Sequence, residues 1–206
     1  MVIKLFFIFS ILGIVTHGYG AVCDAENAER WEYLWRDPAL SLRQRITAEL
    51  AKEQGIATII EVGGFCTPVC NFAKDIEYVN IDPFVHSMQS YECNDAKLIK
   101  KGVEKVVFAE IPIKKPYAVV IIGLYWEFIK NSDVSQLGFI HEALKEASLV
   151  VIENVDNIDW LQRHREQIIS YAKEQGMHES MDFNINILGP QTDAYAFYRH
   201  MSVLRR

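Results

Sequence analysis

The sequence is poor in cysteine and has no excess of positive charge. Of its 206 residues, 21 are Lys or Arg and 27 are Asp or Glu, which gives a formal net charge of −6. Nucleic-acid binding relies on clustered Lys and Arg that displace counterions, so this balance argues against a general nucleic-acid binder. The chain is long enough to bury a substantial core, so its four cysteines are not needed to hold the fold together.

Motifs of several enzyme classes are also absent. No G-x-G-x-x-G follows the first strand-like run, as a nicotinamide dehydrogenase would require, and there is no P-loop of the form G-x-x-x-x-G-K-[ST]. The G-x-S-x-G of serine hydrolases and the H-E-x-x-H of zinc peptidases are missing too. The sequence contains no internal repeat, no low-complexity tract and no N-x-[ST] acceptor for N-glycosylation.

The first twenty residues differ in character from the rest. Lys4 precedes an uncharged apolar run from Leu5 to Val15, and Gly18 and Gly20 stand at the −3 and −1 positions of a cleavage site. This order is typical of a secretory signal peptide and predicts cleavage after Gly20, with export from the cell or into the secretory-pathway lumen. The run is shorter than the ~20 residues that span a bilayer. Membrane attachment is expected only if the segment stays uncleaved, and a buried helix is the other alternative.

Residues 21–206 are predicted to form a single domain that keeps all four cysteines. In an oxidising compartment an even number of cysteines permits two disulfides, in any of three pairings. The cysteines are Cys23, Cys66, Cys70 and Cys93. One alternative is a zinc site built from His86 and the last three cysteines, although their spacing matches no recognised zinc motif. The other is thiol chemistry at Cys66 or Cys70, near the start of a helix.

Short apolar runs rich in β-branched residues alternate with helix-length stretches. Several runs are continuously apolar, which is typical of strands buried on both faces of a parallel sheet. The predicted strands are 56–62, 76–81, 105–111, 117–124 and 148–155. The stretches of helical pattern or helix length are 24–36, about 67–74, 85–101, 133–147 and 158–175. This alternation predicts an α/β fold with a doubly wound, mostly parallel sheet between two helical layers.

One further helix has recognisable ends. Ser41, with Gln44 three residues later, fits a capping box, and Gly55 fits the position that follows the last helical turn. The apolar stripe predicted for this helix consists of Leu42, Ile46 and Leu50.

The C-terminal part of the sequence breaks the alternation. Two strand patterns, 181–188 and 194–204, follow each other with no helix between them, and Gly189-Pro190 begins their connection. Strands joined in this way form an antiparallel hairpin. The predicted layout is therefore five parallel strands followed by a terminal β-hairpin.

The first two predicted strands end in residues suited to a cofactor. Glu61 is followed by Gly63 and Gly64, which permit positive φ and close backbone approach. Asp82 ends the second strand, 21 residues after Glu61, and a carboxylate at this place can accept hydrogen bonds from two ribose hydroxyls. A tight turn at the glycines and a helix start at Asp82 are the simpler alternatives.

The layout and these strand ends resemble the class I S-adenosylmethionine-dependent methyltransferases over about residues 41–206. In that family a loop of the form E/D-x-G-x-G-x-G wraps the methionine part of the cofactor, and Glu61 and Gly63 match its first two fixed positions. Phe65 and Thr67 stand where the later glycines would be. The resemblance implies a three-layer, Rossmann-like fold and S-adenosylmethionine as the cofactor.

The same resemblance implies roles for individual residues. The loop residues Glu61, Gly63 and Gly64 would hold the cofactor, although Gly64 falls between the fixed positions, and Asp82 would bind its ribose. Glu110, in the third predicted strand at 105–111, would accept a hydrogen bond from the adenine amino group.

Methyl transfer from a sulfonium depends mainly on alignment, and a general base is needed only if the acceptor holds its proton firmly. Candidates for that base are His86, Tyr125 and Glu153, and the acceptor would be a small molecule, a glycan or a peptide group. The alternative function is a secreted, non-catalytic binding module that keeps the fold and has lost cofactor binding, as the substituted glycines suggest.

Overall fold

The structure, a computed structural model, describes residues 41–65, 68–85, 91–93, 95–122, 138–155, 159–186 and 198–206. The helices are α3 (Leu42–Glu53), α4 (Gly138–Glu146) and α5 (Asp159–Glu174), with short 3-10 helices at Val69–Phe72, Val103–Lys105 and Phe108–Glu110. The strands are β1 (Thr58–Val62), β2 (Glu77–Ile81), β3 (Lys97–Ile99), β4 (Tyr117–Ile121), β5 (Leu149–Val155), β6 (His178–Asn186) and β7 (Tyr198–Arg205).

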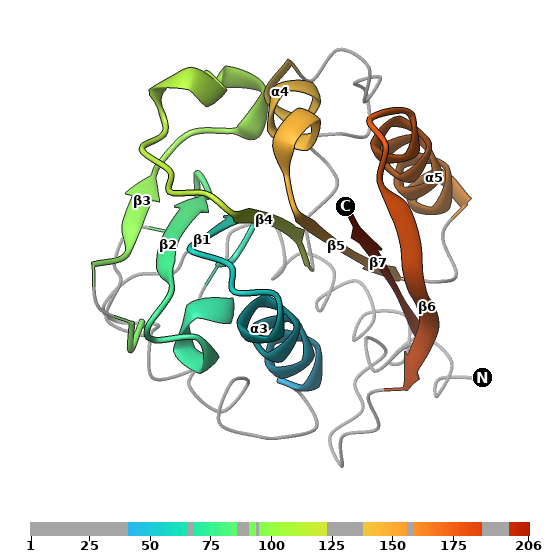
Figure 1. Cartoon of the computed structure of the whole chain (residues 1–206), viewed down its shortest axis with the longest axis horizontal. Coiled ribbons are helices and arrows are strands. Elements are labelled where there is room, and N and C mark those ends of the chain that lie inside the picture. Colours follow the sequence, from blue (N-terminus) through green and yellow to red (C-terminus); the bar gives the residue numbers. More distant parts are fainter. Residues whose placement is uncertain are drawn as a thin grey trace, which may run out of the picture.

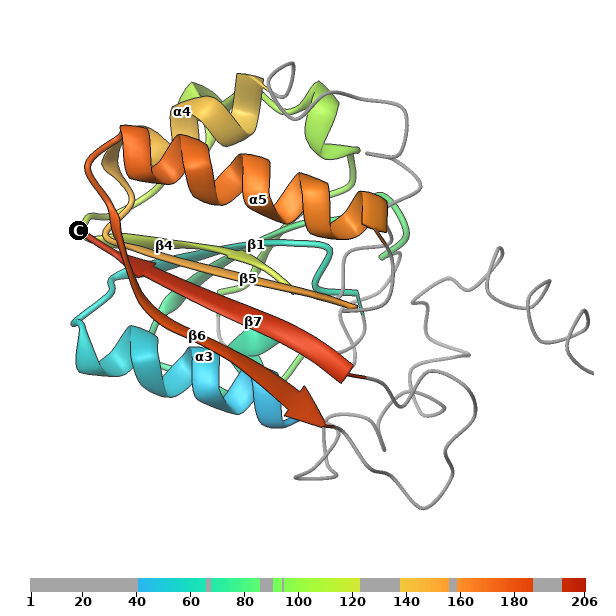
Figure 2. The same ribbon diagram turned by 90° about the vertical axis from the view of Figure 1, so that its right-hand side faces the viewer.

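These strands form one seven-stranded sheet in the order β3-β2-β1-β4-β5-β7-β6 (Figure 1). Strands β1 to β5 pair in parallel, and β7 runs antiparallel between β5 and β6. The predicted doubly wound, mostly parallel sheet with a C-terminal antiparallel hairpin is confirmed. Helices α4 and α5 cover one face of the sheet and α3 covers the other, which gives three layers (Figure 2).

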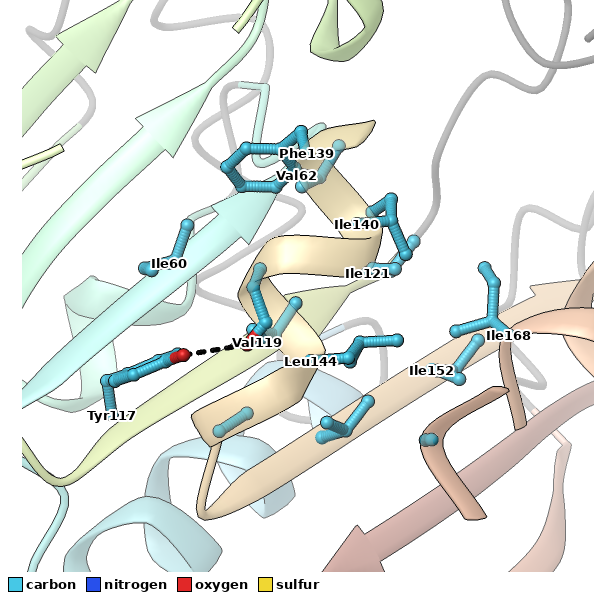
Figure 3. Packing of buried hydrophobic residues seen from close by; sticks show 14 of the residues in the cluster. Ile60, Val62, Tyr117, Val119, Ile121, Phe139, Ile140, Leu144, Ile152 and Ile168 are labelled. Atoms are coloured by element: carbon cyan, nitrogen blue, oxygen red, sulfur yellow. Dashed lines mark hydrogen bonds between the residues drawn. The ribbon is translucent and has the colours of Figure 1, made fainter. Parts of the chain in front are cut away.

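The central strands are buried on both faces, as their continuous apolar runs predicted. All five residues of β1 and of β4 are buried. On one face Ile60 and Val119 pack with Leu144 of α4, and the Tyr117 hydroxyl donates a hydrogen bond to the Ala143 carbonyl at 2.8 Å (Figure 3). Ile59, on the opposite face, packs in the cluster under α3. Apolar burial on two faces is therefore what holds the sheet together.

The prediction of the third strand is wrong in its position. Residues 105–111 form no strand, and the 3-10 helix Phe108–Glu110 lies within them, while the edge strand β3 is Lys97–Ile99, inside the stretch predicted as helix. The apolar side chains of 105–111 are used differently: the Phe108 ring lies 5.8 Å from the rings of Tyr117 and Phe139. Packing against α4 from outside the sheet therefore accounts for a run that looks like a strand in the sequence.

Helix α3 begins and ends where predicted but packs through a different face. Ser41 stands at the N-cap without a capping hydrogen bond, and its hydroxyl accepts one from Arg45 Nε at 2.9 Å, so the predicted capping box is wrong. Leu42 is 39% exposed, and the predicted apolar stripe is wrong there. The buried residues of the helix are Gln44, Thr47, Ala48, Leu50 and Ala51. Its mostly small residues allow the helix to lie close to the sheet, and Gly55 ends it with φ +61°.

No helix within the described ranges is both long enough and apolar enough to cross a lipid bilayer.

Candidate functional site

The carboxyl ends of β1 and β2 lie side by side, and they bring together the two acids that the sequence singled out. Glu61 is paired in register with Asn80, and the Gly63 amide donates to the Ile81 carbonyl at 3.0 Å. Glu61 is 1% exposed and Asp82 is 4% exposed. Ligands of open α/β sheets bind outside this edge, at the carboxyl ends of the strands.

Glu61 is a buried acid with two hydrogen-bond donors on one oxygen. Its Oε2 accepts the amide of Val69 at 2.9 Å and a short hydrogen bond from the Tyr78 hydroxyl. Burial raises the pKa of Glu61 to about 7, although both hydrogen bonds work in the opposite direction. Burial and the neighbouring carboxyl group also raise the pKa of Tyr78 well above its usual value, so this hydroxyl keeps its proton and donates.

The loop after β1 is held by side chains of β2. The Gly64 amide donates to Asn80 Oδ1 at 3.1 Å, and the Phe65 amide donates to Asp82 Oδ2 at 3.0 Å. Gly63 has φ +82°, and Phe65 has φ +43°, a conformation that side chains other than glycine rarely adopt. Positive φ at two positions so close together makes a tight, specifically shaped turn over the end of β2.

Gly64 is needed because the space beside it is occupied. A Cβ atom at this position would lie 2.6 Å from Tyr78 Oη, 3.0 Å from Asn80 Oδ1 and 3.1 Å from Glu61 Cδ. The adjoining Tyr91 hydroxyl donates to the Phe65 carbonyl at 2.7 Å. The loop therefore rests directly on a buried polar network that the chain itself supplies.

Asp82 organises the turn and keeps acceptor capacity. Its Oδ1 accepts the Phe84 amide at 2.8 Å, and its Oδ2 accepts the Phe65 amide. Burial raises the pKa of Asp82, and these two backbone hydrogen bonds oppose that effect. A carboxylate oxygen can accept two hydrogen bonds, so each oxygen has a second position for a further donor.

Glu110 does not lie at the end of a strand. It ends a 3-10 helix and is exposed, on the stretch that returns from β3 to the amino edge of the sheet. The chain has reached the amino edge at Lys114, whose amide donates to Thr58 Oγ1 at the start of β1. The premise for contact with adenine, a strand ending at Glu110, is therefore wrong, since the third strand ends at Ile99.

Glu153 is placed as an ion-pair partner, in contrast to its predicted role as a base. It is completely buried, and its Oε1 accepts hydrogen bonds from Arg43 Nη1 at 3.1 Å and from Arg199 Nη1 at 2.8 Å. Two guanidinium groups therefore already contact this carboxylate. The other two candidate bases, His86 and Tyr125, lie outside the described residues.

Cys70 and Cys93 form a disulfide with their Cα atoms 5.5 Å apart. This pairing selects among the three that the sequence allowed, while Cys23 and Cys66 lie outside the described residues. The disulfide links the 3-10 helix Val69–Phe72 to the segment that carries Tyr91. It also takes two members out of the alternative zinc site and removes Cys70 as a reactive thiol.

Sequence reasoning missed three residues at the carboxyl edge. Arg43 and Arg199 are separated from Glu153 by 110 and 46 residues in the sequence, so no local sequence pattern could predict these ion pairs. Asn154 follows Glu153 on β5 and is 1% exposed, yet neither its side-chain oxygen nor its side-chain nitrogen has a hydrogen-bond partner among the described residues. Buried amide groups are satisfied by water or a bound molecule when the chain offers nothing, so Asn154 marks a polar position next to the strand end.

Comparison with family models and with curated proteins gives no match. Solved structures do match. The plantazolicin methyltransferase BpumL in complex with SAH has a TM-score of 0.54 at 11% identity, over 88% of this chain and 88% of that one. Magnesium protoporphyrin IX methyltransferase from Synechocystis PCC 6803 with bound SAH gives 0.54 at 10% identity, over 94% and 99%. The methyltransferase domain of bacterial CtHen1 gives 0.53 at 12% identity, over 82% and 100%.

This chain has the class I methyltransferase-like fold. Its mixed sheet, mostly parallel with an antiparallel C-terminal hairpin, matches that of these neighbours. At identities this low the likeness extends to the fold alone, so the roles of residues in this chain depend on its own geometry.

The crowding at Gly64 predicts a specific loss of stability. Gly64→Ala should lower the free energy of unfolding by about 1–3 kcal/mol, because the added methyl group overlaps Tyr78 and Asn80. Gly138→Ala is the matched control: nothing lies within 4 Å of its Cβ position, so a change between zero and a gain of about 1 kcal/mol is expected. Urea denaturation of both variants measures the difference. Equal effects would contradict the packing described for the loop.

The raised pKa of Glu61 predicts a dependence of stability on pH. The folded-state pKa of about 7 lies above the ordinary value of 4.5, so the stabilising contribution is full below pH 4.5 and is lost as the pH rises through 7. Relative to Glu61→Gln, the unfolding free energy of the natural chain should fall by roughly 2–3 kcal/mol between pH 5 and pH 8. Urea denaturation across this range measures the gap, and a constant gap would show that burial does not raise the pKa.

Proposed function

We propose that the chain is an S-adenosylmethionine-dependent methyltransferase, which holds the donor at the carboxyl ends of β1 and β2. The acceptor would be a group on a small molecule, a glycan or a peptide. The observation that carries the proposal is Asp82, a buried carboxylate at the end of β2 that touches the β1 loop and retains an acceptor position on each oxygen.

The geometry of Asp82 fits a ribose. Two neighbouring hydroxyls of a sugar can each donate to one oxygen of a carboxylate. In Asp82 the two backbone amides approach different oxygens, so they fix the orientation of the carboxylate and occupy neither oxygen completely. The simpler alternative, in which Asp82 only organises the next turn, is compatible with this role, because the turn contacts hold the carboxylate in place.

The loop conformation supports the same proposal. Phe65 stands where the methyltransferase pattern has a glycine, and it adopts the left-handed backbone conformation that glycine favours, with φ +43°. Strained conformations of this kind persist where the surrounding structure holds them, and they gather at binding sites. Here Asp82 and Tyr91 hold the two backbone groups of Phe65.

The chemistry asks little of the protein beyond alignment. The donor, when bound, supplies a methyl group on a sulfonium, which is already a good leaving group. The contribution of this chain is to fix the donor with Glu61, Gly63, Gly64 and Asp82, and so to orient it toward an acceptor. Glu153 is not proposed as a base, since two arginines hold its carboxylate.

We also propose that residues 1–20 direct the chain into the secretory pathway, and that 21–206 is the working domain. The Cys70–Cys93 disulfide is compatible with this, because disulfides persist in oxidising compartments. The acceptor would then be a molecule of the lumen or the exterior.

One observation favours the alternative, a binding module without cofactor. The amides of Gly64 and Phe65 are already bonded to side chains of β2, so the loop is complete without a ligand.

Calorimetry of the full chain with S-adenosylhomocysteine decides between the two. The methyltransferase proposal predicts saturable binding at one site and at least a tenfold weaker affinity in Asp82→Ala, because the ribose loses its acceptor. Asp75→Ala, which removes an exposed acid, should bind as the natural chain does.

Asp82→Asn keeps one acceptor oxygen for the backbone, and circular dichroism of all variants identifies any loss of fold. Absence of binding to the natural chain at millimolar ligand would contradict the proposal and leave the non-catalytic module.

A further inference from the structure

Three elements converge on Glu153 at the carboxyl edge of the sheet. Arg43 lies in the first turn of α3, Glu153 is near the end of β5, and Arg199 is near the start of β7. Both guanidinium groups donate to the same oxygen of Glu153, at 3.1 Å and 2.8 Å. Neither arginine is more than 17% exposed in its side chain. One buried carboxylate thus faces two partly buried positive charges.

The arginines have hydrogen-bonding capacity that Glu153 does not use. A guanidinium group has five N–H donors in a flat fork, which matches the two oxygens of a carboxylate. The Nη1 atom of each arginine contacts Glu153, while the Nε atoms of both are buried and have no hydrogen-bond partner in the part of the chain that the structure describes. Leaving buried donors without an acceptor is unfavourable, so a ligand that accepts from them has a favourable place to bind.

A purely structural ion pair would not require the second arginine. One guanidinium neutralises one carboxylate, and a second buried cation adds its own desolvation cost together with repulsion from the first. Burial lowers the pKa of Arg43, Glu153 raises it, repulsion from Arg199 lowers it further, and Glu61 raises it. An additional anion beside the pair would offset the extra charge.

The position in the sheet suggests which molecule supplies that anion. In the strand order β2-β1-β4-β5-β7, the arginine pair lies at β5 and β7, on the far side of β1 from Asp82. With strands about 4.8 Å apart, β5 is roughly 10 Å from β1 and roughly 14 Å from β2. A donor held by β1 and β2 would leave this part of the edge to the acceptor.

We infer that Arg43 and Arg199 bind a carboxylate group of the methyl acceptor, so that the substrate is an acidic molecule. The identification of this acidic molecule as the methyl acceptor rests on the proposed function. The two guanidinium groups would receive the carboxylate through donors that Glu153 leaves unused, while Glu153 keeps the forks in place. The substrate would be oriented from β5 and β7, with β4 between these strands and the donor at β1 and β2.

The test follows the Nε–H signals of the arginines by 15N NMR in the full chain, with succinate as the probe. Arg43→Lys and Arg199→Lys assign the two signals by their loss. Both signals should shift saturably with succinate and should not do so with sodium chloride at the same ionic strength. Arg199→Lys should raise the succinate dissociation constant at least tenfold, because lysine lacks the fork. Arg163→Lys, at an exposed position of α5, should leave it unchanged.

Two results would overturn the inference. The first is a shift of the Nε–H signals of the natural chain that follows ionic strength and does not saturate with succinate. This measurement does not depend on the folding of any variant. The second is a shift of both signals by S-adenosylhomocysteine that abolishes the response to succinate, because the arginines would then hold the carboxylate of the donor. The titration of succinate into the free chain needs no donor, so its outcome is independent of the calorimetry with S-adenosylhomocysteine. Failure of that calorimetry alone would remove the methyltransferase proposal.

Discussion

The buried carboxyl group of Glu61 is the contact around which the carboxyl edge of β1 and β2 is built. It joins the end of β1 to the Val69 amide at the start of a 3-10 helix and to the Tyr78 hydroxyl in β2. The loop between these points has no room for a side chain at Gly64, because Tyr78 and Glu61 lie directly beneath it. Burial of an acid is unfavourable unless hydrogen bonds satisfy it, so the buried position of Glu61 depends on the Val69 amide and the Tyr78 hydroxyl.

From that contact the proposed donor site extends across β2. Asn80 and Asp82 continue the line of polar side chains from Glu61, and each accepts one backbone amide of the loop. On the other side of β1, Arg43 of α3 and Arg199 of β7 form a second charged group on Glu153. Arg43 also interacts electrostatically with Glu61, so the two groups are coupled. The edge therefore has an acidic end at β1 and β2 and a basic end at β5 and β7, with β4 between them, which is a suitable arrangement for a donor and an acidic acceptor.

Much of the fold could be predicted because burial on both faces leaves a plain mark on the sequence. The continuous runs at β1, β4 and β5 have that mark, and strand ends in a parallel sheet meet at one edge, so the proximity of Glu61 and Asp82 followed. The edge strand Lys97–Ile99 has no continuous apolar run, since Lys97 is exposed. The residues near Phe108 do form such a run, but they pack on α4 outside the sheet. The link of Arg43 to Glu153 spans 110 residues and depends on the finished fold.

The protonation of Glu61 decides whether the carboxyl edge of β1 and β2 rests on a buried acid. Its pKa can be measured by 13C NMR, from the chemical shift of the side-chain carboxyl carbon as the pH changes. We expect a midpoint of about 7, because burial disfavours the charge of Glu61 more than the Val69 amide and the Tyr78 hydroxyl favour it. A midpoint near the ordinary value of 4.5 would contradict it, since Glu61 would then be solvated and the loop would not rest on a buried polar network.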